Sequence, residues 1–298
     1  MNSVNQIICL MGPTASGKTS LAATLAGQFP VDVISVDSAL VYRSMDIGTA
    51  KPTSLELTRT PHHIIDLLDP SETFSAGDFC QLAMEHIRNI FAQGRIPLLV
   101  GGTMLYFKRL LYGFADLPAA DEDTRRRIEA EADQQGWGQL HGSLKSFDIE
   151  SYHRIHPNDS QRIQRAIEVY RLTGRTMSEL RNKQAVEFPY QSVNVILEPR
   201  DRQFLHARIE QRLNDMFNHR FVDEVTHLYE RGDLSPNLPS IRSVGYRQVW
   251  AYLDGEYDEA TMRQKALVAT RQLAKRQLTW LRRWPDAKRF TLEDVCRD

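Results

Sequence analysis

A segment near the start of the chain has the residue types and spacing of a phosphate-binding loop. It fits the pattern G-x-x-x-x-G-K-[ST] through Gly12, Pro13, Thr14, Ala15, Ser16, Gly17, Lys18 and Thr19. Glycines let the backbone turn tightly, so that successive N–H groups point at one anion, and Lys18 adds a positive charge. Thr19 can hold Mg²⁺ beside the phosphates. The pattern predicts binding of a diphosphate group, but it does not by itself predict ATP hydrolysis.

Asp37 is a second candidate for chemistry, because it follows the apolar run Val31–Val36. P-loop hydrolases place a Mg²⁺-binding Asp at the end of an apolar strand. The corresponding run Ile96–Val100 ends instead in Gly101-Gly102 and offers no acid. Asp37 can be that Mg²⁺ ligand or a general base beside the phosphates, and the residues leave both roles open.

Short apolar runs and helix signals alternate around these residues. Gln6–Met11, Val31–Val36 and Ile96–Val100 have the pattern of buried strands. A helix is expected from about Gly17 to Gln28, and another runs to Phe91 from a capping box made by Ser75 and Asp78. This alternation predicts an α/β fold, a P-loop NTPase-like parallel sheet flanked by helices.

The middle of the chain has a different character and predicts an all-helical insertion. Asp123–Gln135 is charged and helical in pattern, and Ser160–Thr173 is amphipathic, with Gly174 as its C-cap. We therefore expect a catalytic core in residues 1–114 and 187–298 and an insertion in residues 115–186. Tyr190–Leu197 returns to an extended pattern. The remaining segments have helical patterns, namely Asp201–Phe217, His219–Glu230, Tyr246–Leu253 and Glu259–Trp284.

The composition is that of an ordinary globular protein, with basic residues gathered in two places. The 298 residues are 42% hydrophobic and 25% charged, and the net charge is −1. Clustered basic residues on a nearly neutral protein imply a charged partner on one face. The first cluster contains Arg162, Arg165, Arg171, Arg175, Arg181 and Lys183, and the second contains Arg271, Lys275, Arg276, Arg282, Arg283, Lys288 and Arg289.

Other patterns narrow the classes of protein. No apolar run approaches the roughly 18 residues that span a membrane, and Ile7–Met11 is too short for a signal-peptide core, so we expect a cytoplasmic protein without a membrane partner. The three cysteines and the histidine pairs lack the spacing of a metal site, and the thiols are expected to be reduced. These residues are Cys9, Cys80, Cys296, His62, His63, His153 and His156.

Several motifs together resemble the tRNA dimethylallyltransferases, also called tRNA isopentenyltransferases, the IPP transferase family. Besides the loop at Gly12–Thr19, they include Val36-Asp-Ser-Ala-Leu-Val-Tyr42 and Met45-Asp-Ile-Gly-Thr-Ala-Lys-Pro52. Further matches are Leu99–Tyr106, His156–Asp159 with Arg162 and Arg165, Ser243–Gln248, and Thr270–Arg282. The matches run in family order from near residue 7 to near residue 284, so the resemblance covers nearly the whole chain.

The resemblance implies a reaction and the residues that carry it. In the family, a dimethylallyl group passes from dimethylallyl diphosphate to N6 of the adenosine just 3′ of the anticodon in tRNA, with Mg²⁺ as cofactor, and diphosphate leaves. The P-loop then holds the donor's diphosphate, with Thr19 at the metal. Asp37 matches the position of the base, and Thr103 matches a position near the reacting groups. Arg212 is a further candidate cation from its place in the helical segment Ile209-Glu-Gln-Arg212. Alternatives are a helix N-cap for Thr103 and a solvated helix face for Arg212.

The resemblance also implies contacts with the anticodon stem-loop of tRNA. Trp280 can stack on a base, although an amphipathic helix favours packing of this side chain in the core. Taken alone, the basic clusters are more often solvated faces. The matching positions are Asp37, Ser38, Ala39, Leu40, Thr103, Arg125, Gln161, Arg162, Ile163, Gln164, Arg165, Arg242, Ser243, Val244, Gly245, Tyr246, Arg247, Lys275, Arg276, Gln277, Leu278, Thr279, Trp280, Leu281 and Arg282.

Two other classes of protein share the features that do not depend on the resemblance. A P-loop kinase for a nucleoside or small metabolite would also be α/β with a helical lid. A non-catalytic RNA-binding module can use a nucleotide as a switch. The absence of an acid after Val100 and the arginine-rich insertion argue against a kinase, and Asp37 at a strand end argues for catalysis. A monomer is the default expectation, and the choice of tRNA and of prenyl donor stays open.

Overall fold

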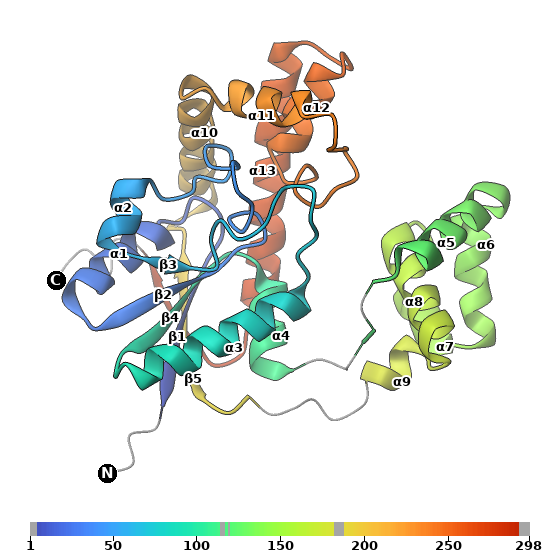
Figure 1. Ribbon diagram of the computed structural model, residues 1–298, viewed down its shortest axis with the longest axis horizontal. Coiled ribbons are helices and arrows are strands. Elements are labelled where there is room, and N and C mark those ends of the chain that lie inside the picture. The colour runs from blue at the N-terminus through green and yellow to red at the C-terminus, as the bar shows by residue number, and fades with distance from the viewer. Residues whose placement is uncertain (1–4, 114–116, 119, 182–187, 292–298) are drawn as a thin grey trace. The chain divides into compact units, whose positions relative to one another are not determined.

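The P-loop, Asp37 and Thr103 each follow the carboxyl end of a strand in one parallel sheet. A computed structural model describes residues 5–113, 117–118, 120–181 and 188–291 (Figure 1). The chain divides into two compact units, Met1–Leu111 with Pro189–Asp298, and Tyr112–Phe188. The expected boundaries at residues 114 and 187 lie a few residues from this division. Cys296 and Lys183 lie outside the described residues.

The first unit contains a six-stranded sheet in the order β3-β2-β4-β1-β5-β6. All of its pairings are parallel, which confirms the predicted fold class. Since parallel strands end at the same edge, the segments that follow β1, β2 and β4 meet there. The strands are β1 (Gln6–Met11), β2 (Val31–Val36), β3 (His62–His63), β4 (Ile96–Gly101), β5 (Gln191–Glu198) and β6 (Ala287–Thr291).

Apolar side chains alternate across the two faces of this sheet, as the two-residue period of a strand requires. One set, which includes Leu10, Val33 and Leu98, packs with Ala22 of α1 (Lys18–Gln28). Another helix, α3 (Ala76–Ala92), packs against the strands β2 and β4 of the sheet. Ser75 and Asp78 form the predicted capping box at the start of α3. Two further helices of this half are α2 (Ser54–Arg59) and α4 (Met104–Tyr112).

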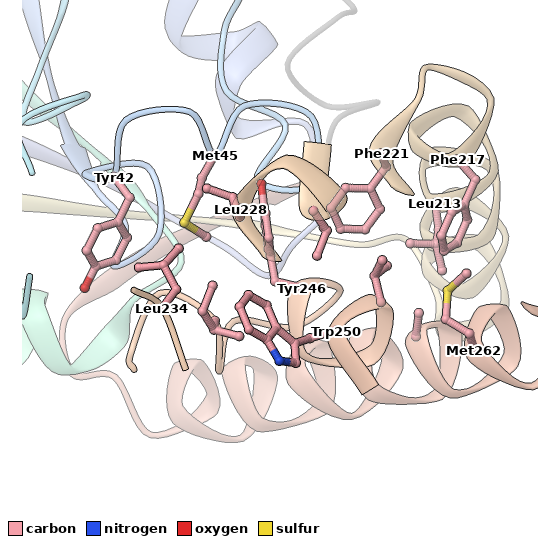
Figure 2. Close-up of a cluster of buried hydrophobic side chains, with 14 of the residues drawn as sticks. Tyr42, Met45, Leu213, Phe217, Phe221, Leu228, Leu234, Tyr246, Trp250 and Met262 are labelled. Atoms are coloured by element: carbon pink, nitrogen blue, oxygen red, sulfur yellow. The ribbon is translucent and has the colours of Figure 1, made fainter. Parts of the chain in front are cut away.

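The C-terminal helices of this unit share a second hydrophobic core with the loop that follows β2. Figure 2 shows Tyr42 and Met45 of the loop among side chains such as Phe217, Phe221 and Tyr246. All five of these side chains are buried. The loop after Asp37 is therefore anchored by apolar burial to helices more than a hundred residues away. The helices are α10 (Arg202–Asn218), α11 (Phe221–Glu230), α12 (Tyr246–Leu253) and α13 (Glu259–Arg282).

The second unit consists of helices in its described residues, as predicted for the insertion. Its core is formed by apolar side chains such as Ile128, Leu144, Ile163 and Ile167. Gly174, in the left-handed conformation, ends α8, as expected from the sequence. The helices are α5 (Glu122–Gln135), α6 (Trp137–Ser143), η1 (Leu144–Ser146), α7 (Ile149–Arg154), α8 (Ser160–Thr173) and α9 (Met177–Arg181).

The end of the chain differs from the expectation. The helix predicted through Trp284 ends at Arg282, and Ala287–Thr291 forms β6 at the edge of the sheet. Pro285 explains the stop, since proline cannot continue a helix. Arg289 of the second basic cluster pairs with Glu198 of β5 and donates to the carbonyl of Leu281 at 2.8 Å. This arginine therefore joins β6 to its neighbours. The sequence analysis also missed β3 and α2.

Candidate active site

The P-loop lies between β1 and α1 and places its backbone around one point. Ala15 and Gly17 both have positive φ, 60° and 94°. The amide of Ser16 donates to the carbonyl of Pro13 at 3.3 Å, which closes the turn. Lys18 Nζ donates to the same carbonyl at 2.6 Å and to Ser16 Oγ at 3.3 Å. The loop thus ends at the positive N-terminus of α1, as a diphosphate site requires.

Lys18 of this loop and Arg212 of α10 are two cations whose side chains are partly buried. Burial and, to a smaller extent, the charge of Arg212 lower the pKa of Lys18 to about 7, although the charge of Asp37 opposes the shift. Burial also lowers the pKa of Arg212, and Asp37 again opposes the change. Asp37 only partly offsets the positive charge of Lys18 and Arg212, so the site is electrostatically complementary to an anion.

The guanidinium of Arg212 donates to the carbonyl of Thr49 at 3.2 Å. That bond and the partial burial of the side chain differ from the solvated helix face that was the alternative for Arg212. Thr49 belongs to the loop Asp46–Lys51, whose backbone amides at Asp46, Ile47 and Gly48 donate to the carboxylate of Glu224 at 2.9, 2.7 and 3.1 Å. Lys51, with a side chain only 3% exposed, bonds the carboxylates of Asp46 and Asp66. Sequence reasoning missed Glu224, since nothing in its neighbourhood marks it.

Asp37 and Thr103 are held next to each other by the backbone at the ends of β2 and β4. Asp37 Oδ1 accepts from the amides of Ala39 and Leu40 at 2.8 and 3.4 Å. Thr103 Oγ1 accepts from the amide of Ser38 at 3.2 Å. The Thr103 hydroxyl therefore binds the loop after β2, which differs from the helix N-cap considered above. Oδ1 of Asp37 therefore orders the loop that follows β2.

The candidate chemical groups of this region line a single cavity of about 560 Å³ in the first unit. The P-loop contributes Thr14, Ala15, Lys18 and Thr19 to its wall. Asp37, Thr103 and Arg212 line the same cavity. Further parts of its wall come from the loop before α12, from α13, from α10 and from the segment that joins β4 to α4. Of the residues implied as RNA contacts, those that line it are Ser38, Ala39, Leu40, Arg242, Ser243, Val244, Gly245, Tyr246, Arg276, Gln277 and Trp280.

Trp280 corrects an expectation from the sequence, because it does not pack in the core. Its side chain is 42% exposed and lines the cavity, and Lys108 Nζ lies 5.7 Å from its ring centroid. An exposed indole at the edge of a cavity is suited to stacking on a base.

Three of the implied RNA contacts in the first unit have side chains that solvent does not reach freely. Tyr246 is buried, and its hydroxyl donates to Glu224 at 2.5 Å. Leu281 is buried, and Leu278 packs against Leu205 and Ile209. These three side chains stabilise the fold by packing, and Tyr246 also stabilises it through its bond to Glu224. By contrast, the side chains that are exposed outside the cavity are Arg247, Lys275, Thr279 and Arg282.

In the helical unit, buried Glu168 engages two of the implied arginines. Arg125 Nε donates to Glu168 Oε1 at 2.9 Å, and Arg165 Nη1 donates to Glu168 Oε2 at 2.6 Å. Ile163 is fully buried in the core of this unit, so its side chain is not an RNA contact. Gln164 donates to Glu129, and the positions that stay exposed are Gln161 and Arg162.

The residues present fit a Mg²⁺ ion that is bound chiefly by its substrate. Thr19 is exposed at the first turn of α1 and lines the cavity with Asp37. Among the described residues there is no group of three or more His, Cys, Asp and Glu side chains suited to hold a metal ion by itself. Mg²⁺ in phosphate sites takes one or two protein ligands and completes its shell with phosphate oxygens and water.

A membrane-spanning helix is also absent from the part of the chain that the structure describes, since none of its helices is both long and apolar enough.

Fold and site together define a P-loop α/β protein with one cavity, which is lined by the P-loop, by Asp37 and by the exposed ring of Trp280. The family model described as IPP transferase matches residues 40–284, and the chain belongs to this family. A tRNA dimethylallyltransferase of Coxiella burnetii is 57% identical over 295 residues, which are 99% of this chain and 95% of that protein. The resemblance found in the sequence is confirmed.

Solved structures agree with this assignment. The full-length tRNA isopentenylpyrophosphate transferase of Bacillus halodurans has 38% identity and a TM-score of 0.70, over 96% of this chain and 90% of that one. A eukaryotic dimethylallyltransferase, solved in crystallographic snapshots of its action on tRNA, has 26% identity and a TM-score of 0.83, over 98% of this chain and 75% of that one.

Proposed function

We propose that this protein transfers a dimethylallyl group from dimethylallyl diphosphate to N6 of the adenosine on the 3′ side of the anticodon in tRNA. The observation that carries the proposal is the cavity, since the P-loop, Asp37, Thr103 and Arg212 line it together with the exposed ring of Trp280. A diphosphate end and a base-stacking end in one cavity suit the transfer of a group from a diphosphate to a nucleobase.

The proposed reaction assigns a proton acceptor and a site for the leaving group. The exocyclic nitrogen attacks the carbon that bears the diphosphate, the C–O bond breaks, and the N6 proton passes to Oδ2 of Asp37. The base helps because the nitrogen's lone pair is delocalised into the ring. Lys18, Arg212 and the P-loop amides stabilise the negative charge that develops on the departing diphosphate. Thr103 lines the same cavity, and its hydroxyl binds the loop that follows Asp37, which supports a place near the reacting groups.

Mg²⁺ is the proposed cofactor, with Thr19 as its protein ligand, and it would supply additional positive charge to the diphosphate. Asp37 Oδ1 is already bonded to two backbone amides. This arrangement favours the base role for its other oxygen. We assign Asp37 as a base and not as the principal metal ligand.

The acceptor adenosine must leave the stack of its anticodon loop to reach the cavity. Bases of a single-stranded loop are cheaper to extrude than bases of a duplex, and aromatic side chains receive them. We propose Trp280 as the stacking platform and Arg242 and Arg276 as contacts of the neighbouring phosphates. The helical unit would hold the stem-loop through exposed residues such as Arg162. The protein is proposed to act as a monomer.

Mass spectrometry of modified RNA tests the proposal. The protein, Mg²⁺, dimethylallyl diphosphate and an unmodified anticodon stem-loop are incubated, and the digested RNA is searched for adenosine with one added C5H8. Asp37→Asn keeps an oxygen for the amides of Ala39 and Leu40 but cannot take a proton. We expect turnover to fall by about 10²–10⁴-fold with the fold intact. Transfer of the γ-phosphate of ATP to a small acceptor, with no prenylated RNA, would instead identify a kinase.

A further inference from the structure

Gln277 of α13 joins two segments that the reaction would use separately. Its Oε1 accepts from the amide of Thr14 in the P-loop at 2.8 Å. Its Nε2 donates to the carbonyl of Gly102, just after β4, at 2.9 Å. The donor group of the amide faces a carbonyl and its acceptor faces an N–H, so only one orientation of the side chain satisfies both partners. These two bonds hold the amide plane of Gln277 in a fixed orientation between the P-loop and the turn after β4.

The amide of Gln277 also fills a space that exists only because residue 102 is glycine. A Cβ on Gly102 would lie 2.5 Å from Gln277 Nε2, closer than side chains approach one another. The same Cβ would lie 3.4 Å from the carbonyl oxygen of Gly12 in the P-loop. The P-loop, the turn after β4 and α13 therefore meet at one tightly filled point.

The two segments that Gln277 bridges carry the two halves of the proposed chemistry. Thr14 belongs to the diphosphate cradle, and Gly102 precedes Thr103, whose hydroxyl binds the loop of Asp37. Arg276 and Trp280 of the same helix line the cavity with Gln277. A second bond from the C-terminal helices to the P-loop runs from Arg208 Nε of α10 to the carbonyl of Ala15 at 2.8 Å. The bond of Arg208 joins α10 to the P-loop, whereas the two bonds of Gln277 join the P-loop to the turn that carries Thr103.

We propose that Gln277 is a positioning residue, which sets the distance between the donor diphosphate and the Asp37–Thr103 pair, and not a contact of the RNA. The inference rests on the proposed function, since it assumes that the P-loop holds the prenyl donor. A displacement of about 1 Å between reacting groups can lower a rate by about 10²-fold. Loss of the bridge should therefore act on the transfer step more than on binding of tRNA.

The test uses Gln277→Met, which keeps the length of the side chain and removes both hydrogen bonds. Gln272→Met is the matched control, because Gln272 is exposed on the same helix and does not line the cavity. Three quantities are measured: affinity for the anticodon stem-loop without donor, affinity for inorganic diphosphate with Mg²⁺ and without RNA, and the single-turnover transfer rate with both substrates saturating. Circular dichroism and thermal melting verify that each variant is folded.

We expect the transfer rate of Gln277→Met to fall by about 10–100-fold, with weaker diphosphate binding and stem-loop affinity within about twofold of the wild type. Gln272→Met should match the wild type in all three measurements. Loss of stem-loop affinity with a normal transfer rate at saturation would make Gln277 an RNA contact and overturn the proposal. A wild-type protein without prenyl transfer would overturn the proposed function instead, so the two failures are distinguishable.

A double-mutant cycle with Gly102→Ala gives a second, independent readout. The new methyl group should displace the amide of Gln277, so the single variants and the double variant should be slowed to a similar extent. Fully additive losses in rate would contradict a shared bridge. If Gly102→Ala does not fold, the three measurements on Gln277→Met decide the question alone.

Discussion

At the scale of single residues, Glu168 shows how an arginine-rich sequence can serve the fold instead of a ligand. Its side chain is fully buried and accepts hydrogen bonds from Arg125, Arg165 and the amide of Asp121. Burial alone would raise the pKa of Glu168, but the hydrogen bonds from the two arginines and the amide outweigh it, so the pKa is lowered. Basic residues that are candidates for RNA binding in the sequence are therefore partly neutralised inside the helical unit.

Glu168→Gln should destabilise this unit, because two guanidinium groups lose their anionic partner. We expect the free energy of unfolding at pH 7 to fall by about 2–3 kcal/mol. A lowered pKa stabilises the fold above the unfolded value of 4.5, and this contribution is lost as the pH falls through the folded value. Denaturant unfolding from pH 7 to pH 3 measures the difference, which should shrink below about pH 4.5. The exposed Glu150→Gln is the control, and equal effects of both variants would contradict the assignment.

At the scale of elements, most helix boundaries follow from local chemistry, and one is strained. Asp side chains cap the N-termini of α5, α8, α10 and α13 by accepting a backbone amide. By contrast, α11 is preceded by Arg220, a non-glycine residue with φ of 70°. The left-handed conformation is unfavourable for a residue with a Cβ, and a cation is poorly placed at a helix N-terminus.

Arg220→Gly should therefore stabilise the protein, although glycine widens the unfolded ensemble. The ion pair of Arg220 with Asp223 is exposed and contributes little. We expect a gain of about 0.5–1 kcal/mol in the free energy of unfolding. Thermal and denaturant unfolding check the prediction, with Arg220→Ala as the control, since it removes the same ion pair and keeps the Cβ. If Ala stabilises as much as Gly, backbone strain is not the cause.

At the scale of the whole molecule, the two units have separate hydrophobic cores. The first unit holds the sheet and the cavity, and the helical unit has a core of its own around Ile163 and Leu144. Its buried polar groups are paired within the unit as well, since Asp148 accepts from Ser178 Oγ at 2.6 Å and from the amide of Ser151 at 3.0 Å. A unit with its own core and internal polar pairs meets the requirements for folding alone.

We expect a polypeptide of residues 112–188 to fold in isolation. Far-UV circular dichroism should show a helical spectrum and a cooperative thermal transition. Ile163→Asn within the fragment places an amide in the core and should abolish the transition, which separates true folding from residual helix. A fragment with a noncooperative melt would show that the helical unit depends on the rest of the chain.

The sequence by itself determined the elements whose signals are local. The P-loop pattern, the buried strands, the capping box at Ser75 and the C-cap at Gly174 depend on neighbours a few residues away, so their spacing is visible in the chain. Asp37 at the end of β2 was found for the same reason, because a parallel sheet brings its strand ends to one edge. The family resemblance added Thr103, which local patterns do not distinguish, and Arg212 was a candidate only from its place in a helix.

Only the tertiary structure decided which polar groups meet and which side chains face solvent. Gln277 and Thr14 are 263 positions apart, and no periodicity connects them. Trp280 is exposed although its helix is amphipathic, and Arg165 pairs with buried Glu168 although its neighbours are basic. The short strand β6 lacks a clear pattern and is added by pairing with β5. Burial depends on partners distant in the chain, so packing decides it and local sequence does not.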